Sequence, residues 1–396
     1  MNLVVLCDSF FPEKNSCANL MTDLCKELAK QNKVILLTVK DNFEKNINFK
    51  NLTIHKIKCF KNKQVNYGYR FFGELLMPFF FMFYIKRKKL FLNYNIDAII
   101  SYSPSIFFSF LTFVLKKKYK CKNYLILRDI FPEWAYYLGI IKKNFIYRIL
   151  KKISHFQYEV ADFIGLQSTG DLIFMNYDDK IKSKSHVLYN WQTNYESKKP
   201  KDHKLINFLD NIKNETNYVY AGNIGIAQDM GKIFELASNI NIFNKINFIF
   251  FTDKQQIKNN IYFKDKRKLK NVYVFDKIPR EELKYIYQTY MNAGIISLKK
   301  KHKTNNIPGK FLDYLQAGLP IFADINKRND LSKFIRDYNV GEVNESDRYL
   351  ELEEKFFKFH KKLKQGTDYK TKCNILFNEK FLTIEAVSKI SSFCKK

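Results

Sequence analysis

The first half of the chain alternates short apolar runs with longer amphipathic segments. The short runs are hydrophobic almost throughout, which is typical of strands that are buried on both faces of a parallel sheet. The longer segments carry apolar residues at helical spacing. We predict strands over Leu3–Cys7, Val34–Val39, Ala98–Ser101, Asn123–Leu127, Phe163–Gln167 and His186–Tyr189, and helices over Ala18–Gln31, Ile106–Lys117 and Phe145–Tyr158. This βαβ rhythm predicts a doubly wound sheet.

The rhythm lapses between Asn190 and Asn217, where Lys, Asn, Asp and Glu predominate. A second domain is therefore predicted to begin in this region. The alternation then resumes, with strands over Tyr218–Ala221, Ile246–Phe251, Asn271–Phe275, Ala293–Leu298 and Leu319–Ala323, and helices near Met230–Asn239, Arg280–Tyr290 and Lys310–Ala317. The second half is thus predicted to be another Rossmann-like domain, and the fold class to be α/β.

The last part of the chain, after Val343, is helical and basic, and Phe377–Phe393 has an apolar face at helical spacing. A chain of 396 residues is long enough for two ordinary domains. We predict a Rossmann-like domain over 1–195, a second over 196–370, and a C-terminal helix over 371–396.

Two apolar runs end in clusters of basic residues. Leu75–Ile85 is followed by Lys86–Lys89, and Ile106–Leu115 is followed by Lys116–Lys118. Both runs fall short of the roughly 20 residues that span a bilayer. Apolar helices with basic ends are suited to lie on an anionic membrane surface. The alternative is that both are core helices with solvated basic ends.

The composition indicates which classes of partner and which cellular compartment to expect for the protein. The chain holds 68 Lys and Arg against 39 Asp and Glu, a formal charge of +29, which favours polyanionic partners such as phosphorylated substrates or anionic lipid. The aromatic residues lie in core-like runs rather than alternating with basic ones, so we expect no nucleic-acid partner. Seven cysteines without a C-x-x-C pair favour reduced thiols in the cytoplasm.

Two patterns indicate an anion site. The strand at Tyr218–Ala221 runs into Gly222 and Gly225 before a predicted helix, and such turns let backbone N–H groups approach phosphate. Lys310 lies in the first turn of a helix that opens at Pro308. A cation at this position destabilises the helix by about 0.3–1 kcal/mol through its interaction with the helix dipole, unless an anion binds beside it. The alternative for the glycines is that a tight turn needs them without any ligand.

Together with the segments Asp8–Glu13, Leu127–Glu133 and Leu188–Trp191, these patterns resemble glycosyltransferase family 4, in particular the branch that builds bacterial surface polysaccharides. The resemblance covers about residues 3–345. The ordered motifs that carry it are Asp8–Glu13, Leu127–Glu133, Leu188–Trp191, Ala221–Gln228 and Pro308–Pro320.

This resemblance implies the GT-B fold, in which two Rossmann-like domains face each other across a cleft and the C-terminal helix packs back on the N-terminal domain. It implies a hexosyltransferase that uses a nucleotide-diphosphate sugar, with no cofactor, and that retains the anomeric configuration. Because the sequence has no Asp-x-Asp motif, we also expect no metal. The acceptor would be lipid-linked or another glycan in surface polysaccharide or lipooligosaccharide synthesis. The enzyme would then be peripheral on the inner face of the cytoplasmic membrane.

The resemblance also implies roles for individual residues. Lys310 and the loop amides would hold the diphosphate, Asp313 would contact the ribose, Asn305 would face the sugar, and Asp129 would lie beside the reacting groups. The candidate catalytic residues are Asp129, Asn305 and Lys310. The candidate donor-binding residues are Gly222, Asn223, Ile224, Gly225, Gln228, Pro308, Gly309, Lys310 and Asp313.

The sequence leaves other interpretations open. The pair of glutamates with seven residues between them that is common in the family is represented here by Asn305 and Asp313. Asp129 precedes a Phe-Pro turn, where aspartate often serves as a turn former. The alternatives to a transferase are a nucleotide-sugar epimerase of the same architecture and an inactive GT-B subunit that binds a partner.

Overall fold

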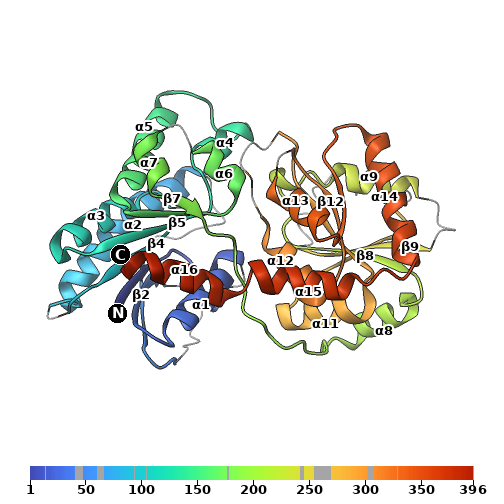
Figure 1. Ribbon diagram of the computed structural model, residues 1–396, viewed down its shortest axis with the longest axis horizontal. Coiled ribbons are helices and arrows are strands. Elements are labelled where there is room, and N and C mark those ends of the chain that lie inside the picture. The colour runs from blue at the N-terminus through green and yellow to red at the C-terminus, as the bar shows by residue number, and fades with distance from the viewer. Residues whose placement is uncertain are drawn as a thin grey trace. The chain divides into compact units, whose positions relative to one another are not determined.

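A computed structural model describes most of the chain, as two compact units. The described residues are 1–13, 15–40, 48–59, 67–92, 94–103, 105–175, 178–240, 245–253, 269–301, 305, 307–327 and 329–395. Unit 1 comprises Met1–Thr193 and Leu382–Lys396, and unit 2 comprises Asn194–Phe381 (Figure 1). Each unit is built around its own parallel sheet.

In the described residues of unit 1, the sheet has seven strands in the order β3-β2-β1-β4-β5-β6-β7, all parallel. The first and last strands in this order are the edges, and β1 and β4 lie near the centre. The strands are β1 (Asn2–Leu6), β2 (Lys33–Val39), β3 (Leu52–Ile57), β4 (Ala98–Ser103), β5 (Lys122–Leu127), β6 (Phe163–Leu166) and β7 (Ser185–Val187).

Helices cover both faces of this sheet because successive side chains of each strand point to opposite faces. Leu3 and Val5 pack in a core with α1 and α16, whereas Val4 and Leu6 pack in a core with α2 and α3. The helices of unit 1 are α1 (Ser16–Leu28), α2 (Tyr67–Lys88), α3 (Phe108–Tyr119), α4 (Glu133–Tyr137), α5 (Phe145–Val160), α6 (Thr169–Phe174), α7 (Asp179–Ser183) and α16 (Thr383–Lys395).

Unit 2 repeats this architecture with six parallel strands in its described part, in the order β10-β9-β8-β11-β12-β13. The strands are β8 (Thr216–Ala221), β9 (Ile246–Phe251), β10 (Val272–Phe275), β11 (Ala293–Ser297), β12 (Ile321–Asp324) and β13 (Gly341–Asn344). Its helical elements are α8 (His203–Ile212), the 3₁₀ turn η1 (Ile226–Gln228), α9 (Gly231–Asn239), α11 (Arg280–Tyr290), α12 (Gly309–Ala317), α13 (Asp330–Asp337), α14 (Tyr349–Lys364) and α15 (Tyr369–Lys380).

The predicted α/β class with two parallel Rossmann-like sheets is confirmed. The inner strands were predicted from their apolar runs, but the edge strands β3 and β13 were not. β3 includes Thr53, His55 and Lys56 and is partly exposed, so it lacks the apolar run on which the prediction depended.

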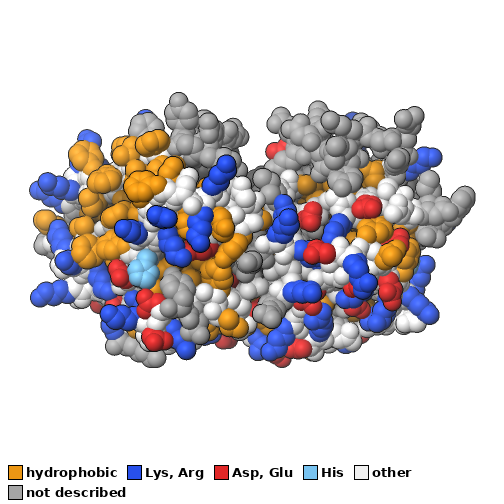
Figure 2. All heavy atoms as spheres, turned by 90° about the horizontal axis from the view of Figure 1, so that it is seen from above, with side chains coloured by type: hydrophobic (Ala, Val, Ile, Leu, Met, Phe, Trp, Pro, Cys, Tyr) orange, Lys and Arg blue, Asp and Glu red, His pale blue; other side chains and the backbone are white. Residues whose placement is uncertain are grey.

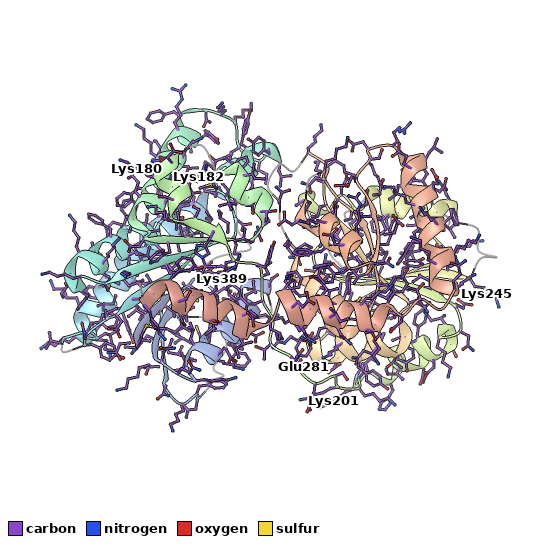
Figure 3. All side chains as sticks on the ribbon, in the orientation of Figure 1. Lys180, Lys182, Lys201, Lys245, Glu281 and Lys389 are labelled. Atoms are coloured by element: carbon purple, nitrogen blue, oxygen red, sulfur yellow. The ribbon has the colours of Figure 1, made fainter. Side chains whose placement is uncertain are left out.

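The end of the chain forms two helices where one was predicted over 371–396. Phe381, between them, packs against Phe311 and Phe334 in unit 2, whereas the next residue, Leu382, pairs with Gln192 in unit 1. The chain therefore passes from one unit to the other between α15 and α16. As predicted, α16 packs back on the N-terminal unit, where it contacts α1 and where the Lys389 ammonium donates to the Val187 carbonyl at 2.8 Å (Figure 3).

The apolar run Leu75–Ile85 lies within α2, a helix of 22 residues that contains Pro78. Met77 and Phe81 face the core of unit 1. Across the described ranges, none of the helices combines the length and the apolar character that a membrane span needs.

Candidate functional site

The two predicted anion-binding segments meet in unit 2. Gly222 follows β8 with φ of +138°, a conformation that side-chain-bearing residues rarely adopt. A Cβ atom built on Gly222 would lie 3.3 Å from both Cε and Nζ of Lys310. The glycine thus gives the backbone its turn and leaves room for the lysine side chain beside it.

The position of Lys310 is set by α12, in which it is the second residue. Tyr314 fixes this helix against the sheet, because its hydroxyl donates to the carbonyls of Val219 on β8 and Ile295 on β11, at 3.1 and 3.3 Å. Its ring lies directly against Gly294 of β11, where any Cβ would clash. The helix start therefore has a defined position relative to the end of β8.

The N-terminus of α12 favours an anion. Pro308 is the N-cap residue and gives the helix no side-chain cap. The first amides of the helix therefore point out of it with their partial positive charge. Pro308 and Gly309 were predicted to open this helix, and they do so.

Lys310 is held in an environment that disfavours its own charge. Its ammonium lies 3.6 Å from the centroid of the Tyr220 ring, and burial lowers its pKa to about 7, with Asp313 opposing the shift. Among the described residues, Lys310 Nζ has no hydrogen bond and no ion pair. An anion bound beside it would favour the charged form and raise this pKa.

The loop after β8 is fixed by internal hydrogen bonds. Gly225 N–H donates to Gln228 Oε1 at 2.9 Å, and Gln228 N–H returns a bond to the Gly225 carbonyl at 3.1 Å. Gly222 N–H donates to the Phe251 carbonyl at 3.0 Å, and the Tyr220 hydroxyl donates to the Asn223 carbonyl at 2.6 Å. Two of the loop amides predicted to bind a diphosphate thus have acceptors within the protein.

The segment after this loop differs from the prediction. The helix was predicted to begin directly after the glycines, but the three-residue turn η1 comes first and α9 begins at Gly231. Ile224 lies in the loop, partly packed against the core of unit 2. The helix after the glycine loop therefore starts six residues after Gly225, whereas the start of α12 brings Lys310 to Gly222.

Asp313 lies one turn after Lys310 on α12 and accepts a hydrogen bond from the Tyr195 hydroxyl at 3.2 Å. The Tyr195 ring lies 4.5 Å from the Arg280 guanidinium and 4.8 Å from the Lys284 ammonium. Lys284 also donates to the Tyr195 carbonyl at 2.5 Å and to Gln316 Oε1 at 2.9 Å.

Sequence reasoning missed Tyr195, Arg280 and Lys284. The two cations are four residues apart on α11, so they share one face of the helix. That spacing is a signal that could have drawn attention to them. Tyr195 precedes the strands of unit 2 and carries no local signal.

Two other predicted residues, Asn305 and Asp129, come from other segments of the chain. Asn305 is 7% exposed, and its neighbours at 302–304 and 306 lie outside the described residues. Asp129 follows β5 in unit 1 and is partly exposed, with its carbonyl accepting from Phe131 N–H at 3.0 Å. The structure thus brings together Lys310, Asp313 and the Gly222 loop, whereas Asp129 belongs to the other unit.

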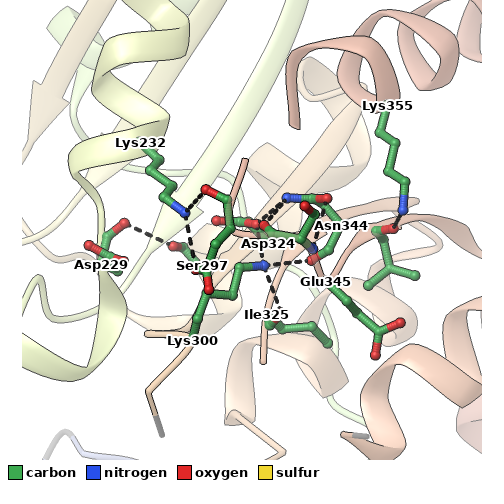
Figure 4. Close-up of polar contacts among 12 residues, drawn as sticks. Asp229, Lys232, Ser297, Lys300, Asp324, Ile325, Asn344, Glu345 and Lys355 are labelled. Carbon is green, nitrogen blue, oxygen red and sulfur yellow. Dashed lines mark hydrogen bonds and ion pairs between the residues drawn. The ribbon is translucent and has the colours of Figure 1, made fainter. Parts of the chain in front are cut away.

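A buried ion pair lies at the carboxyl ends of the unit 2 strands, the same edge of the sheet at which the Gly222 loop begins. Lys300, three residues after β11, donates to Asp324 Oδ1 at the end of β12 at 2.6 Å, with side chains 8% and 1% exposed (Figure 4). Lys300 also donates to the carbonyls of Ile325 and Asn344, at 2.7 and 2.9 Å. These bonds join the ends of β11, β12 and β13 and fix the start of the segment that leads to α12.

Comparison with solved structures identifies the architecture. Sucrose-phosphate synthase from Thermosynechococcus elongatus matches with a TM-score of 0.75 at 8% identity, covering 100% of this chain and 98% of that one. Anabaena HepE in complex with UDP and glucose matches with a TM-score of 0.70 at 10% identity, covering 100% and 99%. The chain has the GT-B fold. WaaG, a glycosyltransferase involved in lipopolysaccharide biosynthesis, has the same GT-B arrangement, with a TM-score of 0.64 at 13% identity over 99% of both chains.

No protein-family model matches the chain, and no curated protein matches it in sequence. The GT-B fold is therefore established by structural similarity, and membership of family 4 stays a prediction. Identities of 8–13% carry the fold but not the activity.

Proposed function

We propose that the chain is a GT-B glycosyltransferase that moves a hexose-type sugar from a nucleotide-diphosphate sugar to an acceptor. The observation that carries this proposal is the meeting of the Lys310 ammonium with the Gly222 turn, at the uncapped start of α12. A departing nucleoside diphosphate concentrates negative charge, and a pre-positioned cation and helix N-terminus stabilise that charge as it develops.

The roles follow from this placement. Lys310 and the first turn of α12 bind the diphosphate, and Asp313 accepts the ribose hydroxyls. Asn305 faces the donor sugar, and Asp129 lies beside the reacting groups of the sugar and the acceptor. The reaction proceeds with retention and with charge stabilisation by Lys310 and the helix in place of a metal ion. Anabaena HepE was solved with UDP and glucose, which supports UDP-glucose as the first donor to test.

The outer surface of unit 1 supports a lipid-linked acceptor. On α2, four exposed apolar side chains recur at helical spacing and form one outward stripe: Phe72, Leu76, Phe79 and Phe83. The neighbouring helices add exposed apolar residues to this surface, namely Phe110 and Val114 on α3 and Phe145, Ile146 and Ile149 on α5. In Figure 2, hydrophobic side chains gather on unit 1, at the left of the view, with Lys and Arg beside them.

The positive charge beside this apolar surface favours an anionic membrane as its binding partner. Lys86, Arg87, Lys88 and Lys89 are all exposed at the C-terminal end of α2, and Lys117 and Lys118 are exposed at the end of α3. An apolar stripe enters the acyl boundary while the lysines contact lipid phosphates. We place the enzyme peripherally on the inner face of the cytoplasmic membrane, in surface polysaccharide or lipooligosaccharide synthesis. The role of WaaG in lipopolysaccharide biosynthesis supports this pathway.

The proposal is tested by titrating the protein with UDP- and GDP-sugars in a calorimeter, and then by incubating the bound donor with polyprenyl-diphosphate-linked glycans. A transferase binds one donor saturably and releases its nucleoside diphosphate only when the acceptor is present. An epimerase converts the donor sugar without an acceptor, and an inactive subunit turns over neither. Absence of saturable binding to every nucleotide sugar tested would sink the proposal.

A further inference from the structure

Lys277 is a second lysine at the Gly222 loop, and it comes from a different part of the sheet. It follows the end of β10 by two residues, and its exposed side chain donates to Asn223 Oδ1 at 2.5 Å. Because β9 lies between β10 and β8, the lysine reaches over the carboxyl end of β9 to the loop after β8. Asn223 thus holds the ammonium of a residue 54 positions away.

The loop itself offers little positive charge. Its residues from Gly222 to Asp229 include neither Lys nor Arg. The amides of Gly222 and Gly225 are engaged with Phe251 and Gln228, and η1 is too short to give a helix dipole. Any cation on this side of the loop must come from another segment, and Lys277 is placed to supply it.

Lys310 does not balance a diphosphate by itself. A nucleotide sugar carries one negative charge on each of its two phosphates, and the pKa of Lys310 is lowered to about 7 by burial. Lys310 lies against Gly222, and Lys277 lies against Asn223, the next residue. The two lysines therefore contact two consecutive residues of one turn, and each phosphate of the donor can be paired with its own cation.

We infer that Lys277 is a donor-binding residue that exchanges Asn223 Oδ1 for a phosphate oxygen of the nucleotide sugar, an inference that rests on the proposed function. The exchange forms and breaks only hydrogen bonds. It replaces a neutral amide acceptor with an anionic one, and charge-assisted bonds are the stronger kind. Lys277 is exposed, so its side chain can turn toward the ligand without unpacking the core.

The test compares Lys277→Met with Lys277→Arg by calorimetric titration with UDP-glucose, UDP and uridine. Loss of one charge-assisted bond should weaken UDP-glucose and UDP binding by about tenfold or more. Uridine lacks phosphate, so its affinity should not change. Lys277→Arg should restore most of the diphosphate affinity, and the affinity of Lys277→Met should depend less steeply on salt than that of the wild type.

Lys245→Met is the matched control. Lys245 is also exposed in unit 2, but it precedes β9, at the opposite edge of the sheet (Figure 3). Lys245→Met removes one positive charge from unit 2, as Lys277→Met does, and should leave UDP-glucose binding unchanged. If Lys277→Met and Lys245→Met both bind UDP-glucose as the wild type does, Lys277 is not a ligand and the proposed donor site survives without it. If the wild type binds no nucleotide sugar, the proposed function fails and this inference fails with it.

Discussion

The hydroxyl of Tyr195 donates a hydrogen bond to Asp313 Oδ1 at 3.2 Å, and this bond sets the orientation of the carboxylate proposed to bind ribose. Arg280 and Lys284 hold the Tyr195 ring from α11, so the tyrosine has little freedom to move away. The bond uses one carboxylate oxygen. A carboxylate held in this orientation is pre-positioned for a ribose hydroxyl.

We expect Tyr195→Phe to weaken UDP binding by about threefold to tenfold, because loss of a hydrogen bond of about 0.5–1.5 kcal/mol frees the carboxylate to rotate. Asp313→Ala should weaken it more. In the double variant the two effects should not add, since Tyr195 acts only through Asp313. Calorimetric titration of the four proteins measures this coupling. Additive losses would mean that Tyr195 does not act by positioning Asp313.

Lys310→Ala should lower the affinity for UDP-glucose by about tenfold or more without lowering the melting temperature. The lysine is desolvated, and in the described part of unit 2 its ammonium lies over the Tyr220 ring without an ion pair, so its removal takes none from the fold. Lys333→Ala, on the exposed side of α13, is the matched control for charge. Unchanged binding by Lys310→Ala would show that the donor site is misplaced.

The affinity for UDP-glucose should also depend on pH. The pKa of Lys310 is lowered to about 7, so the free protein loses this charge as pH rises through neutrality. If binding needs the protonated lysine, affinity should be constant below that pKa and fall by up to about tenfold per pH unit above it. The diphosphate of UDP-glucose does not titrate in this range. Lys310→Arg keeps its charge, so its affinity should be flat from about pH 6 to about pH 8.5.

The membrane surface is tested by replacing apolar side chains of the α2 stripe. Phe79→Ser with Phe83→Ser should reduce sedimentation with phosphatidylglycerol-containing vesicles by about tenfold or more, because each buried aromatic side chain contributes about 1.5–3 kcal/mol. Neutralising Lys86, Arg87, Lys88 and Lys89 should weaken the same binding, most strongly at low salt.

The control for this experiment is Leu350→Ser, which removes an equally exposed apolar side chain from α14 in unit 2. It should sediment with vesicles as the wild type does. Full vesicle binding by the Phe79 and Phe83 variant would mean that the stripe does not enter the bilayer.

How much the sequence could predict depends on whether a feature is local. Inner strands such as β4 and β9 are buried along their whole length and are mostly apolar, so their sequences alone revealed them. Of the edge strands of the described sheets, β7 and β10 were predicted, whereas β3 and β13, which mix polar and apolar residues, were missed.

The same distinction holds at the site. The glycine turn after β8 and the lysine at the start of α12 each carry a local pattern, and the structure places them side by side. Tyr195 and Asp313 are 118 residues apart, and Lys277 and Asn223 are 54 apart. Such pairs depend on strand order and helix packing, which no local pattern specifies.

The ion pair of Lys300 and Asp324 should be important for stability, because both partners are desolvated. Burial lowers the pKa of Lys300 and raises that of Asp324, and each charge opposes the shift of the other. Lys300→Met leaves Asp324 buried without its cation and should lower the free energy of unfolding by about 3–5 kcal/mol.

The double variant Lys300→Met with Asp324→Asn should recover part of this loss, since it buries no unpaired charge. Lys301→Met, at the adjacent exposed position, should change little. Urea denaturation of the four proteins measures these differences, and a loss below about 1 kcal/mol in Lys300→Met would show that water replaces the lysine.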